Sequence, residues 1–447
     1  MWCKALEEYF HSVRLISDRC KGCVNCIRRC PTEAIRIRNG KAQITEARCI
    51  DCGECIRRCA NHAKTAITDC LDDIQQYKYN IALPAPALYA QFSADTPIES
   101  ILCALLKLGF DDVFEVARAA EIVSLGIKEY LKRSDIKRPA ISSACPAVVR
   151  LIQVMFPELI GNLIPIDAPV EVAARIARSA AIHKLNIPSE DIGIWFITPC
   201  PAKMTTVKQP LGTEKSNVTG AISISKIYGD LLKALPVQPA GLSGQRASWI
   251  GIGWTVSGGE NAAVEVSNSL VVNEIGSVSE ILEQVTLGKL NHVDHIEALA
   301  CAGGCIGGPL TVENRFVAQH RIKQRTQKMI AKNVAQGKTL CQSDLEVALG
   351  VAERRAIEPR SILRLDEDIF KAMYKVELME KTLKELPGLD CGSCGSPNCK
   401  ALAEDIAQGT ASKTDCVFIL REKVRDLAQE MVRLAEKLPP SLHKTKR

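Results

Sequence analysis

The central part of the chain contains four cysteines whose neighbours fit a metal or cluster site. Cys301 and Cys305 are separated by Ala302-Gly303-Gly304, and glycine lets the backbone approach a bulky group closely. A zinc knuckle more often has a two-residue gap and a matching cysteine pair nearby, which this stretch of sequence lacks. The remaining ligands must therefore come from distant segments. The candidates are Cys145 and Cys200, each followed by a proline.

Strand-like segments precede these cysteines. Apolar runs alternate with helical patterns from about residue 80 to residue 310, which predicts an α/β domain. The runs are Asn80–Ala87, Pro139–Ala144, Ile192–Thr198 and His295–Ala300, and each of the last three is followed closely by an isolated cysteine. Ligands of open parallel sheets lie at the carboxyl ends of strands, so we expect the thiols to meet in one crevice.

The N-terminal 75 residues contain a repeated cysteine pattern. Cys-x2-Cys-x2-Cys-x3-Cys occurs at Cys20, Cys23, Cys26 and Cys30 and again at Cys49, Cys52, Cys55 and Cys59. Between the copies, Asn39-Gly40 joins two alternating runs and predicts a β-hairpin.

This spacing is typical of two [4Fe–4S] clusters in which the fourth cysteine of each run ligates the other cluster. One predicted ligand set is Cys20, Cys23, Cys26 and Cys59, and the other is Cys30, Cys49, Cys52 and Cys55. The segment resembles a bacterial two-cluster ferredoxin. Two zinc sites are the alternative, but zinc does not require eight interleaved cysteines.

A third cysteine group lies near the C-terminal end of the sequence. The segment Asp390–Cys399 resembles the small four-cysteine iron–sulfur domain of redox complexes and corrinoid-protein systems, with its pattern Asp-Cys-Gly-x-Cys-Gly-x-Pro-x-Cys. The resemblance implies a further [4Fe–4S] cluster with the ligands Cys391, Cys394, Cys399 and Cys416.

Composition limits the classes of function. A chain of 447 residues is too long for one core, and 20 cysteines in a reducing compartment favour metal ligands over disulfides. The sequence has no apolar run of membrane-spanning length and its first residues do not resemble a signal peptide, so we expect a cytoplasmic protein without a membrane partner. The net charge of +6 is offset by the negative charge of thiolate-ligated clusters, and only 4% of residues are aromatic, so we expect no nucleic-acid partner.

Three segments together resemble the signature motifs of [FeFe]-hydrogenases, in order. They are Ser143–Pro146, Thr198–Lys203 and Glu297–Cys305, and Ala85–Ala87 and Ser257–Gly259 resemble further segments of that family. The resemblance implies an H-cluster, which is a [4Fe–4S] cube held by Cys145, Cys200, Cys301 and Cys305 and joined through Cys305 to a two-iron unit carrying CO, cyanide and a dithiolate. It also implies that Lys203 donates hydrogen bonds to a cyanide and that Pro86 contacts the cofactor.

Several positions depart from the pattern of active members. The cysteine that passes protons to the two-iron unit is replaced by Ala144, and a relay serine by Ile164. The helix that supplies relay glutamates keeps at best Glu129. The acid after the second motif is replaced by Thr206, and the methionines flanking the two-iron site by Thr198 and Leu299. These changes predict slow turnover, which is typical of sensory members.

We therefore predict an α/β two-lobed H-cluster domain with parallel sheets, flanked by an α+β ferredoxin-like domain and a small helical iron–sulfur domain. The expected bounds are 1–75 for the ferredoxin domain, 76–365 for the H-cluster domain, 366–425 for the C-terminal cluster domain and 426–447 for a helix end and basic tail.

The predicted function is slow reversible interconversion of H2 and protons that serves H2 or redox sensing in an anaerobe. The catalytic positions implied are Lys203, Ala144 and Cys305, and the partner is a ferredoxin-like or signalling redox protein. The alternative is a non-catalytic electron-transfer or cluster-assembly protein that carries only cubes. Retention of Lys203 and of Ala302-Gly303-Gly304 favours the first hypothesis.

The other cysteines and the histidines carry little signal. Cys3, Cys70, Cys103 and Cys341 fit no ligand spacing, so we expect small core residues at these positions. His292 and His295 flank the last predicted strand, and we assign them no functional role.

Overall fold

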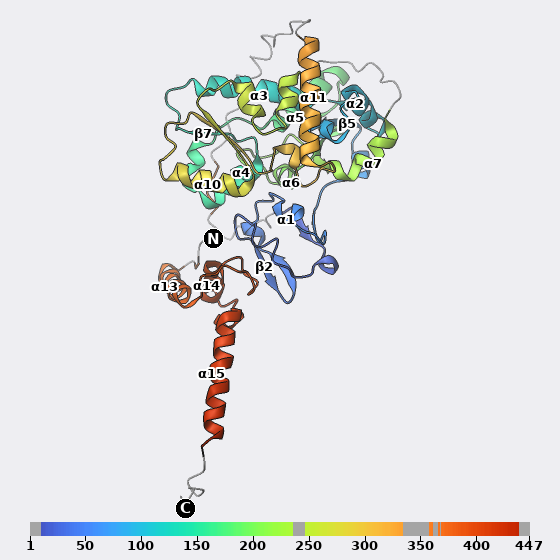
Figure 1. The fold of residues 1–447 in the computed structure, drawn as a ribbon. Coiled ribbons are helices and arrows are strands. Elements are labelled where there is room, and N and C mark those ends of the chain that lie inside the picture. The colour runs from blue at the N-terminus through green and yellow to red at the C-terminus, as the bar shows by residue number, and fades with distance from the viewer. Residues whose placement is uncertain (1–9, 236–245, 334–356, 361–364, 367, 438–447) are drawn as a thin grey trace, which may run out of the picture.

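The computed structural model describes residues 10–235, 246–333, 357–360, 365–366 and 368–437 (Figure 1). Cys3, Cys341 and the basic tail at residues 442–447 lie outside the described residues.

A four-stranded parallel sheet forms the centre of the larger lobe. Its order is β6-β5-β8-β9, with β5 (Tyr79–Pro84), β6 (Asp112–Val113), β8 (Ile192–Thr198) and β9 (Gly220–Ser223). Every residue of β8 is buried, as expected for a strand covered on both faces of a parallel sheet.

Alternate residues of these strands pack into two separate cores. Ile194 and Phe196 face one core, whereas Trp195 and Ile197 face the other. Helices α3 (Val116–Leu131) and α5 (Pro169–Leu185) cover the first face. The second face is covered by α2 (Ile98–Lys107), α7 (Ile224–Ala234), α8 (Trp249–Gly253) and α11 (Arg315–Asn333).

The smaller lobe contains a second parallel sheet. Its order is β10-β11-β7, with β7 (Ala140–Ile141), β10 (Ser269–Asn273) and β11 (His295–Leu299), and it packs with α4 (Pro146–Met155) and α10 (Ile275–Thr286). Cys145 and Cys301 therefore follow strands of this sheet, while Cys200 follows β8 of the other sheet. The thiols therefore meet between two parallel sheets, in agreement with the predicted two-lobed domain.

The N-terminal unit is small and built from two antiparallel strand pairs. β1 (Val13–Leu15) pairs with β4 (Lys64–Ala66), β2 (Ile35–Arg38) forms a hairpin with β3 (Lys41–Ile44), and α1 (Glu54–Arg57) follows that hairpin. The predicted Asn39-Gly40 turn is confirmed, since both residues have positive φ angles, 52° and 72°.

The C-terminal unit is helical and packs against the N-terminal unit. It consists of α13 (Ile369–Glu385), α14 (Cys399–Ala407) and α15 (Val417–Ala435). Asp405 of α14 accepts hydrogen bonds from Arg36 and Arg38 of β2, and Glu404 pairs with Arg48. Helix α15 then projects away from the rest of the molecule (Figure 1).

The remaining elements are short. They are α6 (Pro201–Lys208), α9 (Gly259–Val264) and 3₁₀ helices at Ser17–Arg19, Glu46–Arg48, Leu71–Gln76, Pro86–Gln91, Pro157–Asn162, Ser189–Asp191, Cys305–Gly307 and Lys413–Asp415. Among the described helices, none combines the length and the apolar character that a membrane span requires. Cys103 is buried as predicted, but the prediction of a core position for Cys70 is wrong, because Cys70 is exposed and donates to Asp73.

Candidate active site

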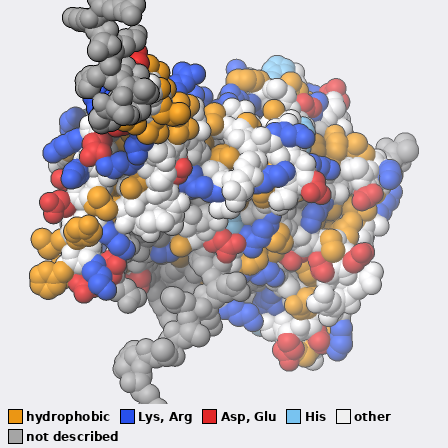
Figure 2. Space-filling model, turned by 90° about the horizontal axis from the view of Figure 1, so that it is seen from below, with side chains coloured by type: hydrophobic (Ala, Val, Ile, Leu, Met, Phe, Trp, Pro, Cys, Tyr) orange, Lys and Arg blue, Asp and Glu red, His pale blue; other side chains and the backbone are white. Residues whose placement is uncertain are grey.

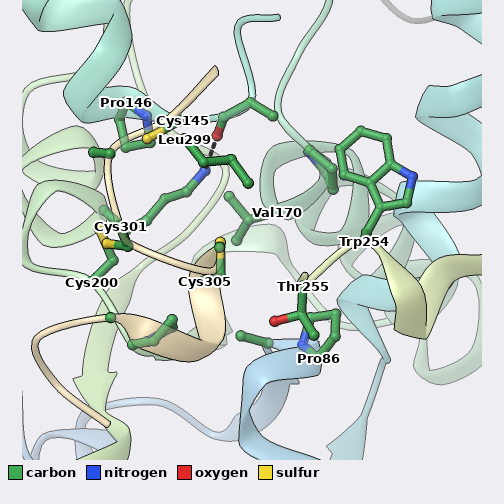
Figure 3. A pocket seen from close by; sticks show the side chains of 18 of the residues that line it. Pro86, Cys145, Pro146, Val170, Cys200, Trp254, Thr255, Leu299, Cys301 and Cys305 are labelled. Atoms are coloured by element: carbon green, nitrogen blue, oxygen red, sulfur yellow. Dashed lines mark hydrogen bonds between the residues drawn. The ribbon is translucent and has the colours of Figure 1, made fainter. Parts of the chain in front are cut away.

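The four central cysteines line one cavity (Figure 3). Cys145 is the N-cap residue of α4 and Cys200 is the N-cap residue of α6, and each helix begins with a proline. Proline suits the first helical position because its missing N–H would have no partner there. Both helices thus direct their partially positive N-terminal ends toward the thiols, which favours an anionic group.

The thiols are close enough to oppose one another's ionisation. Burial raises the pKa of Cys305 to about 12, and the neighbouring Cys301 and Cys145 contribute to this increase. Burial and the same neighbours raise the pKa of Cys200. Four thiolates can coexist this close together only around a cationic centre, so the donor set fits an iron–sulfur cube.

Glycine is required in the loop between Cys301 and Cys305. Gly303 and Gly304 have φ angles of +80° and +97°, and a Cβ on Gly304 would lie 2.6 Å from the carbonyl oxygen of Thr255 and from the amide nitrogen of Ser257. Ser257 N donates to the Gly303 carbonyl at 3.1 Å, which fixes the loop beside the segment that follows α8.

The cavity extends past the thiols into an apolar space. Figure 3 shows Cys305 between the other three cysteines and the side chains of Val170, Trp254 and Pro86. Lys203 also lines this space, and its Nζ donates to the Ala144 carbonyl at 3.1 Å, the dashed line in Figure 3. The cavity therefore has room beside the four thiols, with a lysine at its wall.

The other predicted site positions divide into those at the cavity and those away from it. Leu299 lines the cavity, but Thr198 does not; its hydroxyl instead accepts a hydrogen bond from Cys200 N at 3.1 Å. That Thr198 flanks a two-iron site stays a prediction. Ile164 is buried in the larger core, and Glu129 is paired at the surface with Lys132. Thr206 lines a smaller adjoining cavity that shares Ala144 and Lys203.

Two buried carboxyl groups at the cavity were not singled out from the sequence. Glu297 of β11 and Glu260 of α9 both line it. Burial raises the pKa of Glu297 to about 7, with a further contribution from the negative charge of Glu260. The Glu297 carboxylate accepts hydrogen bonds from Gly258 N at 2.7 Å and Asn261 N at 2.8 Å, which hold it in place. The only sequence signal was an acid inside an otherwise apolar strand.

Glu260 extends this acidic group away from the cavity. Its Oε2 accepts a hydrogen bond from Ser142 Oγ at 2.6 Å, and its Oε1 lies 3.2 Å from His295 Nε2. All three side chains are buried. The geometry provides ionisable oxygens and a ring nitrogen within one connected group.

The N-terminal unit reaches the central site through α1. Nη1 of Arg57 donates to the Gly307 carbonyl at 2.7 Å, and Nη2 pairs with Glu54 at 2.6 Å. Burial lowers the pKa of Arg57, but the negative charges of Cys301 and Glu54 outweigh it and raise the pKa above its usual value. The same guanidinium hydrogen-bonds the Cys301 sulfur.

One of the two predicted N-terminal ligand sets shares a cavity. Cys30, Cys49, Cys52 and Cys55 line one small cavity. Burial, together with the charges of Cys23 and Cys20, raises the pKa of Cys26 to about 11, and Cys59 packs in the same hydrophobic cluster. Backbone amides of Ala34, Ala42 and Ala63 donate to the sulfurs of Cys30, Cys20 and Cys59 at 3.3, 3.4 and 3.2 Å. Such bonds stabilise a negatively charged cluster.

The four C-terminal cysteines line a cavity of their own, together with Pro387, Leu402 and Val417. This unit lies beside the first N-terminal group, since a Cβ on Gly392 would contact Ile27 and Val24 at 3.5 and 3.6 Å. At the other side, Cys52 lines both the second N-terminal cavity and the central cavity. The four cysteine groups are thus arranged in series.

Comparison with protein families agrees with this arrangement. Residues 78–259 and 254–309 match the family described as iron only hydrogenase large subunit, C-terminal domain. The chain belongs to the iron-only hydrogenase family. In this hydrogenase-family chain, residues 12–60 also match a 4Fe-4S dicluster domain and residues 386–418 match a putative Fe-S cluster family.

Individual relatives of this hydrogenase-family chain are distant. It is 24% identical over 391 residues to the NADP-reducing hydrogenase subunit HndD of Solidesulfovibrio fructosivorans, covering 74% of this chain and 62% of the relative. It is 26% identical over 397 residues to the periplasmic [Fe] hydrogenase large subunit of Nitratidesulfovibrio vulgaris, covering 74% and 94%. A solved structure of a variant of the [FeFe]-hydrogenase HydA1 from Chlamydomonas reinhardtii aligns with a TM-score of 0.48 at 14% identity, covering 65% of this chain and 98% of that one.

Proposed function

We propose that this protein is a slow [FeFe]-type hydrogenase that uses H2 turnover to report on H2 or redox state. The observation that carries the proposal is the space beside the four thiols, lined by Lys203 and continuous with the cysteine site. A protein that carries only a cube has no need of this apolar space. Membership of the iron-only hydrogenase family supports the same conclusion.

Cys145, Cys200, Cys301 and Cys305 would hold the cube, and the space toward Pro86 and Trp254 would hold the two-iron unit. The H-cluster, when bound, supplies the interconversion of H2 with two protons and two electrons. Lys203 presents a charged donor to an anionic ligand of this unit, and the apolar wall excludes water.

Glu297 is the residue we propose for proton transfer, in place of the cysteine absent at Ala144. A carboxyl group with a pKa of about 7 changes protonation near neutral pH, which suits an acid–base role. Glu260 lies next along the same buried group and would exchange the proton through Ser142 or His295. A route of buried groups held by fixed hydrogen bonds is consistent with slow turnover.

Electrons would pass along the cysteine groups in series. The C-terminal group is the outermost, the two N-terminal groups are intermediate, and the central group is the innermost. We therefore propose that the C-terminal cluster is the port at which a redox or signalling partner exchanges electrons. The chemical state of the central site would reach that partner as the oxidation state of the outermost cluster.

Infrared spectroscopy of the matured protein tests the cofactor. We expect bands from bound CO and cyanide. A protein that retains its cubes after maturation but shows no such bands would be the cube-only electron carrier instead.

A pair of variants tests the proton route. Glu297→Gln removes the carboxyl group, and we expect turnover to fall by about 100-fold, a typical acid–base contribution. Glu129→Gln changes the one acid retained on the usual relay helix, whose side chain is 41% exposed and paired with Lys132, and should leave turnover unchanged. A larger loss from Glu129→Gln than from Glu297→Gln would refute the proposed route.

A further inference from the structure

Helix α15 carries an apolar stripe that the described part of the chain leaves uncovered. All of its residues except Ile419 are exposed, and none belongs to a buried core. Figure 2 shows the molecule from below, the side toward which α15 projects in Figure 1, with hydrophobic side chains exposed among charged ones. Among the apolar residues of the stripe, Met431 is 70% exposed and Leu427 is 61% exposed.

The stripe has the spacing of a coiled coil. Apolar residues recur at alternating intervals of three and four, at Val417, Leu420, Val424, Leu427, Met431 and Leu434. In heptad terms, the a positions are Val, Val and Met, and all three d positions are Leu. Apolar residues that alternate at a and d form the seam along which the helices of a coiled coil pack.

Charged residues beside the stripe favour one type of partner helix and one relative direction of the two helices. The g positions on the helix are Lys423 and Glu430, and the second and third e positions are Ala428 and Ala435. Between two parallel copies, each charged g residue would face an alanine. Between two antiparallel copies with Val424 opposite Leu427, Lys423 of each helix lies near Glu430 of the other, so the same sequence complements itself twice.

We infer that α15 pairs with α15 of a second copy of this chain as an antiparallel two-helix coiled coil. In this pairing the globular parts of the two copies lie at opposite ends of the paired helices, where they do not compete for space. Three heptads make a short coiled coil, so the dimer should dissociate on dilution. The inference does not depend on the proposed function.

The helix pairing also determines how far apart the C-terminal clusters of the two copies lie. Cys416, a ligand candidate of the C-terminal cluster, is the N-cap residue of α15. An antiparallel pair therefore holds the outermost clusters of the two copies apart, one at each end of the coiled coil, and leaves each accessible to its own partner.

Sedimentation velocity of the holoprotein over a range of concentrations tests the pairing. We expect a monomer–dimer equilibrium. Leu427→Glu places a charge in the centre of the stripe and should weaken the dimer by at least roughly tenfold. Val432→Glu is the matched control, because Val432 is 59% exposed on the same helix but outside the stripe. A monomer at all concentrations, or a dimer that Leu427→Glu leaves intact, would overturn the inference.

Charge reversal tests the direction. Glu430→Lys should weaken an antiparallel dimer by about tenfold, since it converts two attractive pairs into two repulsive ones. Adding Lys423→Glu to the same chain should restore the wild-type dissociation constant. Equal affinities in all three proteins would exclude the antiparallel arrangement. Monomers that bind anionic lipid vesicles through this helix would show that a membrane surface, not a second copy, is the occupant.

Discussion

Arg57 offers a direct test of how the N-terminal unit influences the central cube. Its guanidinium is mostly buried, hydrogen-bonds the Cys301 sulfur and is fixed by Glu54 and the Gly307 carbonyl. A cation in this position stabilises the reduced cluster, which carries one more negative charge, so the reduction potential is higher with Arg57 than without it. Arg57→Gln should therefore lower the potential of the central cube.

The magnitude follows from the contact. A hydrogen bond to a charged group contributes about 1.5–3 kcal/mol. Since about 1.4 kcal/mol corresponds to about 59 mV for one electron, the expected decrease is about 60–130 mV. Arg58→Gln is the matched control. Arg58 has the same charge and also pairs with Glu54, but its side chain is 42% exposed and its other contact is Glu274.

Redox titration followed by EPR measures both variants after loading with [4Fe–4S] cubes. The central signal is identified as the one that Cys200→Ala removes. The reasoning is refuted if Arg57→Gln leaves the central potential unchanged, or if Arg58→Gln shifts it by the same amount.

Three further predictions concern stability. Gly304→Ala should lower the unfolding free energy by more than about 2 kcal/mol, because the added Cβ would lie 2.6 Å from backbone atoms. Gly229→Ala in α7 should raise it by about 0.5–1 kcal/mol, because the added Cβ would meet nothing within 4 Å. Chemical denaturation measures both changes. Asp405→Asn removes the anion that pairs with Arg36 and Arg38, so it should lower the stability of the interface between the N-terminal and C-terminal units by about 3 kcal/mol, measured as faster hydrogen exchange in α14. Glu385→Gln, which breaks an exposed ion pair with Lys413, should change that stability by less than about 0.5 kcal/mol. Because the pKa of Glu297 is raised from 4.5 to about 7, the native protein keeps a proton on this carboxyl group that the unfolded chain loses. The unfolding free energy of the apoprotein should therefore fall by up to about 3 kcal/mol as the pH rises from about 4.5 to about 7. Glu297→Gln should abolish that part of the pH dependence.

The cysteine groups were predictable because ligand spacing is a local property. Cys20 to Cys30 and Cys391 to Cys399 each define most of a site within one short segment. The hairpin at Asn39-Gly40 is equally local, since two residues determine its turn. The central group was predictable for another reason, namely that cysteines directly after apolar runs mark the ends of strands.

Groups that depend on tertiary pairing were not predictable. Glu260 and Glu297 come from different elements and meet only because α9 lies beside the end of β11. His295, to which the sequence assigned no role, lies against Glu260 at 3.2 Å. The docking of Asp405 onto Arg36 joins segments 369 residues apart, and no periodicity within either segment indicates it.

The assignment of each strand to one of the two sheets could not be predicted. Apolar runs predict strands but not their neighbours, so β8 and β11 look equivalent in sequence although they belong to separate sheets. The heptad pattern of α15 can be read directly from the sequence, but only the structure shows that no other described element covers it.

The four central thiols are held largely by main-chain features, and this has an evolutionary consequence. Two helix N-termini and a glycine turn hold the thiols, so the affinity for an anionic cluster depends little on the surrounding side chains. Substitutions such as Ala144 and Leu299 can then accumulate without loss of the cofactor. A lineage can then change the walls of the cavity in single mutational steps, each leaving a folded protein that still binds its cluster and on which selection can act.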